Sequence, residues 1–182
     1  SNNGLTNNEV NELCGDKNGR MYIRSGNDLI KLDIYTEQFT CLRQKGVYGL
    51  FCKKDTLWVS CADGIYYYTG QGTELTFFAR VQKGFVGRAL YVDKETVWVV
   101  TRKYLVAISR EDPLRQEILL TLDKGNCILG DSSGNIWVGA WNGLYRISPD
   151  RETTAMLVIR EWGNYPIIRS DACWKMILSI FG

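Results

Sequence analysis

The sequence predicts an all-β protein made of four-stranded antiparallel β-propeller blades, and two observations lead to this prediction. The first is a short motif that occurs four times with an aromatic residue at its centre: Tyr22, Trp58, Trp98 and Trp137. These residues are 36, 40 and 39 positions apart, and a period of about 40 residues filled with short strands is typical of a propeller blade. The second is the alternation of short apolar runs with turn sequences, with almost no helical periodicity.

Each repeat begins with a short apolar or alternating run, which we interpret as its first strand. These runs are Val10–Cys14, Val47–Cys52, Ala89–Val92 and Cys127–Leu129. The second strand carries the aromatic residue among β-branched and other apolar neighbours, which suit the interior of a sheet. The second strands are Met21–Ile23, Leu57–Val59, Val97–Val99 and Ile136–Val138. We expect the four aromatic side chains to pack between blades.

A tight turn joins the first two strands of each repeat. In the first and fourth repeats it reads Asp16-Lys-Asn-Gly19 and Asp131-Ser-Ser-Gly134. The aspartate can accept hydrogen bonds from the turn amides, and the glycine supplies a positive φ angle. The second and third repeats lack this glycine, so we expect their turns to differ.

A second hairpin and a variable fourth strand complete each repeat. The third strands are Leu29–Leu32, Ile65–Tyr68, Leu105–Ile108 and Leu144–Ile147, and the fourth strands are Phe39–Arg43, Leu75–Val81, Ile118–Leu122 and Ala155–Trp162. The predicted blades therefore span about 9–44, 47–82, 86–123 and 126–162, within one partial propeller domain over 1–182.

The last residues, 170–182, can be aligned with the opening of the first repeat. This alignment predicts a partial fifth blade and hence a piece of a longer protein. The alternative is an apolar C-terminal strand or short helix that docks on the fourth blade.

Composition and charge exclude several classes of function. The 182 residues are 45% hydrophobic and 23% charged, which is typical of a globular domain. The net charge is only +2 and no basic run occurs, so we expect no nucleic-acid partner. No apolar stretch is long enough to span a membrane, so we expect no membrane contact by this segment. The chain has no histidine, which excludes a Ser–His–Asp or Cys–His arrangement and a histidine-based zinc site.

The six cysteines show no Cys-x-x-Cys pair, so we expect no metal site and no cofactor. Cys14, Cys52 and Cys127 fall in first strands, where we expect buried free thiols. A disulfide remains open, but the spacing does not select a pair. The acidic residues show no paired spacing for acid–base catalysis, so we predict no catalytic residue.

The strongest repeats resemble a known family. The pattern Asn7-Asn8-x-Val10 leading to Asp16-x-x-Gly19, together with Asp131-x-x-Gly134-Asn-Ile-Trp137-Val-Gly139, is similar to the two-component regulator propeller repeat. The resemblance covers about residues 4–162 and is strong in the first and fourth repeats, but weak in the second and third. Arg24 and the Arg102-Lys103 turn depart from the family pattern.

This resemblance implies a sensor role. Such repeats form the periplasmic part of hybrid two-component system sensor histidine kinases, in which two seven-bladed propellers precede an immunoglobulin-like domain, a membrane span and the phosphorelay domains. Their ligands are typically glycan fragments, and the receptors signal as dimers. The resemblance implies that this chain is a non-enzymatic, periplasmic fragment of a seven-bladed propeller whose parent is a histidine kinase of the inner membrane.

The turns between second and third strands are the candidate ligand site. Trp141 lies in one of them beside Asn142, and an exposed aromatic ring next to an amide is a pairing that suits a sugar. The equivalent turns supply the remaining candidates, Asn27, Asp63, Arg102 and Lys103. Propeller topology brings these turns to one face, where they predict an oligosaccharide site. The alternative is that they are ordinary turn residues.

Two further hypotheses compete with glycan sensing. One is a structural or dimerisation module without a ligand site of its own. The other is a propeller enzyme such as a streptogramin-type lyase, which the lack of histidine makes the weakest. Because four blades and a stub leave apolar sheet faces open, we expect the isolated chain to self-associate, with a homodimer as the simplest form.

Overall fold

The structure is a computed structural model that describes residues 4–151 and 154–157. Within these residues, sixteen strands form four separate four-stranded antiparallel sheets. Blade 1 contains β1 (Val10–Gly15), β2 (Arg20–Ser25), β3 (Asp28–Asp33) and β4 (Gln38–Arg43), and blade 2 contains β5 (Val47–Lys53), β6 (Thr56–Cys61), β7 (Gly64–Tyr68) and β8 (Thr76–Ala79). Blade 3 contains β9 (Gly87–Val92), β10 (Thr96–Thr101), β11 (Tyr104–Ser109) and β12 (Gln116–Thr121), and blade 4 contains β13 (Cys127–Gly130), β14 (Ile136–Ala140), β15 (Gly143–Ile147) and β16 (Thr154–Leu157).

The strand order in every sheet follows the chain, so each blade is a meander of three hairpins. This confirms the predicted all-β fold with four propeller blades. One turn of 3₁₀ helix, η1 (Gln82–Gly84), lies in the connection between blades 2 and 3. The predicted fifth blade at 170–182 and the end of the predicted last strand lie outside the described residues. In the part of the chain that is described, no helix is long and apolar enough to cross a membrane.

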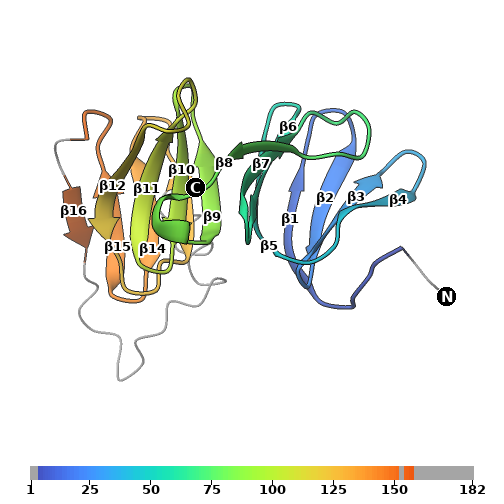
Figure 1. The fold of residues 1–182 in the computed structure, drawn as a ribbon, viewed down its shortest axis with the longest axis horizontal. Helices are drawn as coiled ribbons and strands as arrows, with labels where there is room; N and C mark the ends of the chain where they lie inside the picture. The colour runs from blue at the N-terminus through green and yellow to red at the C-terminus, as the bar shows by residue number, and fades with distance from the viewer. Residues whose placement is uncertain (1–3, 152–153, 158–182) are drawn as a thin grey trace.

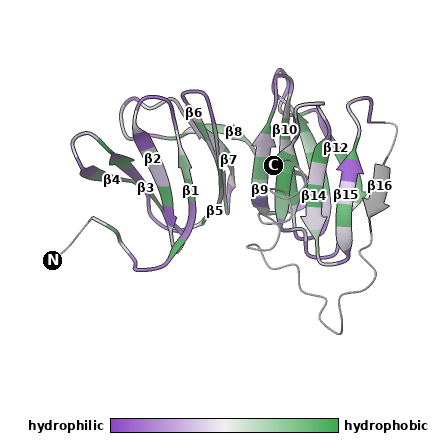
Figure 2. Cartoon of the chain, turned by 180° about the vertical axis from the view of Figure 1, so that it is seen from behind, coloured by the Kyte–Doolittle hydropathy of each residue, from purple (hydrophilic) through white to green (hydrophobic). Residues whose placement is uncertain are grey.

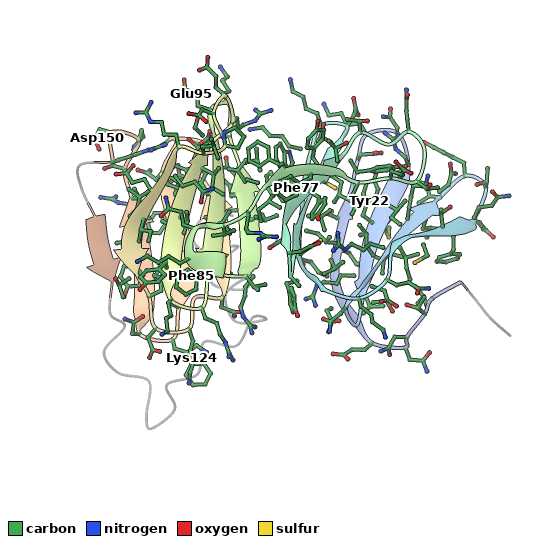
Figure 3. The ribbon with its side chains drawn as sticks, viewed as in Figure 1. Tyr22, Phe77, Phe85, Glu95, Lys124 and Asp150 are labelled. Atoms are coloured by element: carbon green, nitrogen blue, oxygen red, sulfur yellow. The ribbon has the colours of Figure 1, made fainter. Side chains whose placement is uncertain are left out.

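The blades stand side by side, with their first strands next to one another. β1 contacts β5, β5 contacts β9, and β9 contacts β13. Figure 1 shows β1, β5 and β9 following one another across the molecule. The turns within the blades gather at two opposite ends of the strands. Figure 3 shows Glu95 and Asp150 at one end and Lys124, in the connection between blades 3 and 4, at the other.

The hydrophobic core consists of three clusters, each between two consecutive sheets. All six residues of β10 are buried, because this strand is covered on both faces. Val97 and Val99 pack with blade 2, whereas Trp98 and Val100 pack with blade 4, as the two-residue period of a strand requires. Figure 2 shows the hydrophobic colour running along β10 and the hydrophilic colour in many of the turns.

The repeated aromatic residues contribute to these clusters. Tyr22 packs against blade 2, Trp58 against blade 3 and Trp98 against blade 4. All three are buried, which confirms that they are packing residues. Trp137 is only partly buried.

The aspartate of the first turn binds the aromatic residue of the same blade. The Asp93 carboxylate accepts a hydrogen bond from Trp98 Nε1 at 2.6 Å, and the Asp131 carboxylate accepts one from Trp137 Nε1 at 2.9 Å. The second carboxylate oxygen accepts hydrogen bonds from amides of the turn. In Asp131 these donors are the amides of Ser133 and Asn135. Tyr22 donates to Asp16 in the same way at 3.2 Å. In blade 2 the corresponding position holds Lys53, whose Nζ instead donates to the carbonyl oxygen of Val92.

This contact explains why the motif repeats as aspartate, turn and aromatic residue. Gly19 and Gly134 have φ angles of 74° and 84°, as the sequence predicts for the turns of the first and fourth repeats. Burial alone would raise the pKa of Asp131, but the hydrogen bonds from Trp137, Asn135 and the turn amides together hold it below its usual value. Asp131 therefore contributes stability above its unfolded pKa, and this contribution is lost as the pH falls through its folded pKa.

Replacing Asp93 by asparagine is expected to lower the free energy of unfolding by about 1–3 kcal/mol, because a buried charge-assisted hydrogen bond to Trp98 is lost. Urea unfolding followed by circular dichroism measures the change. The matched control is Asp55→Asn in the corresponding turn of blade 2, where the exposed carboxylate accepts a hydrogen bond from the side chain of Asn18. We expect less than about 0.5 kcal/mol there. Equal losses in the two variants would show that the aspartate–tryptophan contact has no special weight.

The expectation of free thiols is confirmed for Cys14 and Cys52, which are partly buried. It is wrong for Cys127, which is disulfide-bonded. The sequence could not show this, because a disulfide depends on the distance between two side chains in space.

Candidate functional site

A cavity of about 690 Å³ lies where the first strands of all four blades meet. Its volume is within the range of about 300–1,000 Å³ that small-ligand pockets usually have. Each blade contributes side chains from its own first strand. The cavity therefore forms only when the blades pack side by side. The lining residues from the first strands are Asn11 and Glu12 of β1, Tyr48, Leu50 and Phe51 of β5, Arg88–Tyr91 of β9, and Cys127–Leu129 of β13.

Apolar and aromatic side chains form part of the wall. Phe51 and Tyr91 meet edge to face with their ring centroids 5.2 Å apart, and Leu50, Leu90 and Leu129 lie in the same lining. Hydrogen-bonding groups form the rest, among them Tyr48, Asn27 and Asn126. A wall of this mixed character can contact both the apolar faces and the hydroxyl groups of a sugar.

Glu12 joins blades 1 and 2 at this cavity. Its Oε2 accepts a hydrogen bond from the backbone amide of Leu50 at 3.1 Å and lies 3.4 Å from Nε of Arg24. Burial raises the pKa of Glu12 to about 7, against the opposing effects of Arg24 and the Leu50 amide. Near neutral pH this carboxyl group is therefore only partly ionised, and it only partly neutralises Arg24.

Three arginines come together around the cavity. Arg88 interacts electrostatically with Arg102, Tyr48 and Arg24, and burial followed by the two neighbouring guanidinium groups lowers the pKa of Arg88. Arg24 and Arg88 line the cavity, whereas Arg102 lies in the adjacent turn between β10 and β11. Within 4–151 and 154–157, Arg88 makes no ion pair with an acidic side chain. The lining also contains the carboxylates of Glu9 and Glu12, and Glu9 accepts a hydrogen bond from Asn11 Nδ2 at 2.6 Å. The positive charge is therefore concentrated where Arg88 lies near Arg102.

The predicted site residues do not form a single group in the structure. Asn27 lines the cavity, and Arg102 lies close enough to Arg88 to repel it. Asp63 is instead engaged by Arg43 at 2.7 Å and by the hydroxyl of Tyr66. Lys103 is exposed, and its amide donates to Thr101 Oγ1, which stabilises the turn that replaces an Asn–Gly pair.

Trp141 and Asn142 lie in the corresponding turn of blade 4. The Trp141 side chain is 52% exposed, and Nζ of Lys124 lies 3.5 Å from the centre of its ring. Asn142 accepts a hydrogen bond from the Asp123 amide at 3.4 Å. One face of the indole therefore already contacts a cation, and neither residue is among those that line the cavity.

The residues that sequence reasoning missed are Glu12, Arg24, Tyr48 and Arg88. A signal was present, since Glu12 is an acidic residue and Tyr48 carries a hydroxyl group inside a predicted first strand. Arg88 was missed because the predicted strand began at Ala89, whereas β9 begins at Gly87.

Replacing Glu12 by glutamine is expected to flatten the pH dependence of stability between about pH 5 and 8. Because the folded pKa of about 7 lies above the ordinary glutamate value of 4.5, Glu12 destabilises the fold as the pH rises through this window. The loss amounts to about 1–3 kcal/mol. Urea unfolding of both proteins at pH 5 and pH 8 measures it, with the exposed Glu111→Gln variant as the control. A wild-type stability that changes with pH just as it does in Glu12→Gln would contradict the assignment.

The fold is similar to that of several solved structures. The extracellular domain of BT4673 from B. thetaiotaomicron, named as a one-component system, superposes with a TM-score of 0.69 at 16% identity, over 86% of this chain and 24% of that one. The extracellular domain named as the hybrid two-component system BT3049 from the same organism gives 0.65 at 13% identity, over 86% and 25%. A streptogramin B lyase gives 0.66 at 17% identity, over 84% and 55%.

At these identities the similarity concerns the fold, and this chain spans about a quarter of the length of the two sensor domains. No protein-family model matches the sequence, and no curated protein matches it. The propeller fold is shared by sensor domains and a lyase, so function has to be argued from the site.

Proposed function

We propose that this chain is part of the periplasmic sensor region of a hybrid two-component system histidine kinase, and that its central cavity binds a glycan fragment. The chain itself is not an enzyme. Binding is signalled by a phosphorelay through kinase and receiver domains of the receptor that are not in this sequence.

The observation that carries the proposal is the cavity lined by the first strands of all four blades. Aromatic and aliphatic side chains, amides and a tyrosine hydroxyl line it together, which suits a sugar ring and its hydroxyl groups. A ligand there would contact several blades at once. Binding could therefore change how the blades pack, and such a change can reach a distant domain if the bound and free states differ in packing.

The similarity to the extracellular domains of two-component sensors supports the proposed location and role. The structural similarity to a streptogramin B lyase would favour an enzyme only if this chain had a catalytic group. The chain contains no histidine that could act as one. The motif resemblance in the first and fourth repeats agrees with the sensor assignment.

A glycan array followed by isothermal titration calorimetry of each hit tests the proposal. We expect at least one oligosaccharide to bind, and we expect Tyr48→Ala to weaken it because Tyr48 lines the cavity. The matched control is Tyr35→Ala, since Tyr35 is 79% exposed on blade 1 and is not part of the cavity lining. Absence of binding to any glycan, with the protein shown to be folded, would overturn the proposal.

The alternative function is a structural or dimerisation module with no ligand site. It would be favoured if no glycan binds while light scattering shows a stable homodimer. Equal weakening by Tyr48→Ala and Tyr35→Ala would instead place the ligand away from the cavity.

A further inference from the structure

We infer that the ligand of the central cavity is acidic, and that Arg88 with Arg102 and Arg24 binds its carboxylate or sulfate group. This inference rests on the proposed function and adds the chemical class of the ligand. The relevant class is an oligosaccharide that contains a uronic acid or a sulfated sugar.

Three positively charged side chains lie close together beside the cavity. Arg24 comes from β2, Arg88 from β9 and Arg102 from the turn after β10, and Arg88 interacts with both of the others. Like charges that the fold brings together destabilise one another unless an anion lies between them. Of these three arginines, only Arg24 has an acidic partner among the described residues, Glu12, at the long distance of 3.4 Å.

Among the described residues, no carboxylate forms an ion pair with Arg88 or Arg102. Glu9, which also lines the cavity, accepts a hydrogen bond from Asn11. Asp63 is paired with Arg43, and Asp28 accepts the Lys45 amide in the connection from blade 1 to blade 2. Arg88 is exposed and carries its guanidinium group at the cavity. A guanidinium group can donate two parallel hydrogen bonds to a carboxylate or sulfate.

The adjoining wall suits the rest of an acidic sugar. Asn11, Asn27 and Asn126 provide amides that can donate to and accept from hydroxyl groups. The apolar residues Leu50 and Leu90 and the aromatic residue Phe51 lie in the same lining and can contact a ring face. The arginines therefore favour a negatively charged ligand, and the cavity wall favours a ligand that contains a sugar ring.

Nuclear magnetic resonance of the arginine side chains tests the anion site without knowledge of the natural ligand. The probes are sodium glucuronate, its uncharged methyl ester and sodium sulfate, each titrated at constant ionic strength. We expect saturable shifts of the Arg88 Nε–Hε signal with glucuronate or sulfate and none with the ester. The glucuronate and sulfate titrations distinguish a carboxylate from a sulfate ligand.

Arg88→Gln should weaken anion binding about 10- to 100-fold, and Arg88→Lys should restore part of it because it keeps the charge but not the paired donors. The matched control is Arg146→Gln, an exposed arginine on β15 that does not line the cavity, which should leave binding unchanged. No saturable shift, or equal binding by wild type and Arg88→Gln, would overturn the inference.

The results separate this inference from the proposed function. If neutral oligosaccharides bind in the cavity while neither anion shifts Arg88, the sensor proposal stands and the acidic ligand is wrong. If the anions bind at Arg88 but no oligosaccharide binds, acidic or neutral, the anion site stands and glycan sensing is wrong.

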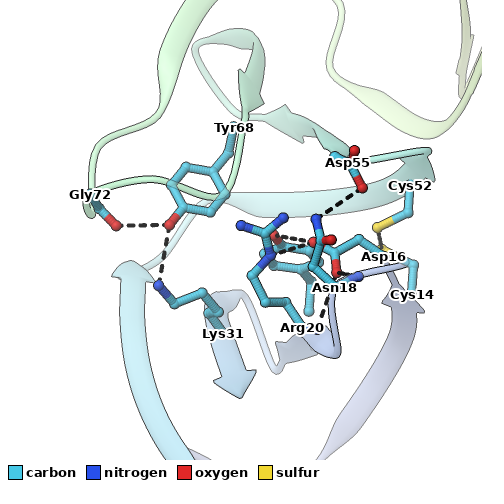
Figure 4. Close-up of polar contacts among 10 residues, drawn as sticks. Cys14, Asp16, Asn18, Arg20, Lys31, Cys52, Asp55, Tyr68 and Gly72 are labelled. Atoms are coloured by element: carbon cyan, nitrogen blue, oxygen red, sulfur yellow. Dashed lines mark hydrogen bonds and ion pairs between the residues drawn. The ribbon is translucent and has the colours of Figure 1, made fainter. Parts of the chain in front are cut away.

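A second, independent observation concerns Cys14 and Cys52. Their sulfur atoms lie 2.7 Å apart across the contact between blades 1 and 2, and both are free thiols. Figure 4 shows the two side chains pointing toward each other. The strand register explains this arrangement, because Cys14 is opposite Tyr22, which faces blade 2, and Cys52 is opposite Leu57, which packs with blade 1.

We propose that Cys14 and Cys52 form a disulfide that links blades 1 and 2 under oxidising conditions. In the balanced reaction, a disulfide donor exchanges with the two thiols, so one S–S bond breaks and another forms. The two protons and two electrons of the cysteine thiols leave on the donor as two thiols. An oxidised small-molecule or protein disulfide is therefore the required oxidant.

Peptide mapping without reduction, after incubation of the protein with oxidised glutathione, tests the link. We expect a cross-linked peptide pair containing Cys14 and Cys52, and a melting temperature higher by roughly 5–10 °C than with both thiols reduced. Cys14→Ser and Cys52→Ser should each abolish the shift, whereas Cys41→Ser, which replaces an exposed free thiol, should keep it. Free, alkylatable Cys14 and Cys52 after oxidation would overturn the proposal.

Discussion

Replacing Trp98 by alanine is expected to lower the free energy of unfolding by about 3–5 kcal/mol, the range for large aromatic residues in protein cores. The side chain is 4% exposed, packs against Ile136 and Val138 of blade 4, and donates to Asp93. Its removal would leave a cavity between two blades and would deprive Oδ2 of Asp93 of its indole donor, while Oδ1 keeps the amides of Glu95 and Thr96. Urea unfolding followed by circular dichroism in the far ultraviolet measures the loss.

The matched control is Trp141→Ala, which removes the same side chain from a turn. Because Trp141 is half exposed, with the Lys124 ammonium group at its ring, we expect a loss below about 1 kcal/mol. A loss from Trp141→Ala as large as that from Trp98→Ala would contradict the division of the tryptophans into packing residues and surface residues.

Replacing Gly49 by valine is expected to destabilise the protein by about 3 kcal/mol through overpacking. A Cβ atom at Gly49 of β5 would lie 2.7 Å from the carbonyl oxygen of Arg88 and 3.4 Å from Cα of Ala89. Both contacts are with the backbone of β9, so blades 2 and 3 would have to move apart. Thermal and urea unfolding measure the effect.

Gly15→Val is the matched control, since a Cβ atom at Gly15 of β1 meets only the Arg20 carbonyl oxygen at an ordinary 3.6 Å. We expect little change there. Because a side chain at position 49 would displace the backbone of Arg88, Gly49→Val should also weaken the binding of any ligand in the cavity. Equal stability of the two valine variants would show that the close approach of β5 and β9 is not required.

The blades could be predicted from the sequence because their signals are local. The spacing of Tyr22, Trp58 and Trp98, and the aspartate and glycine of the first turn, follow from strand and turn geometry within one repeat. The aspartate–tryptophan hydrogen bond was not predicted, although the two residues recur together. Its geometry depends on how the indole turns toward the hairpin, and the sequence does not show this.

The site was harder to predict because it is formed by several blades at once. Arg88 and Glu12 lie 76 positions apart in the sequence and come together only when the first strands stand side by side. Two of the turn residues that the sequence suggested as ligand-binding residues have contacts of their own in the structure. Trp141 contacts the Lys124 ammonium group, and Asp63 forms an ion pair with Arg43. Of the predicted turn residues, Asn27 lines the cavity and Arg102 lies near Arg88, but the sequence did not indicate Arg88 itself.

A crystal structure of the protein with its best-binding oligosaccharide tests most directly whether the cavity between the first strands is the ligand site. The prediction is that the sugar lies against β1, β5, β9 and β13, with its acidic group within hydrogen-bonding distance of Arg88. A sugar bound at the Trp141–Asn142 turn, or at any other place away from these four strands, would contradict it.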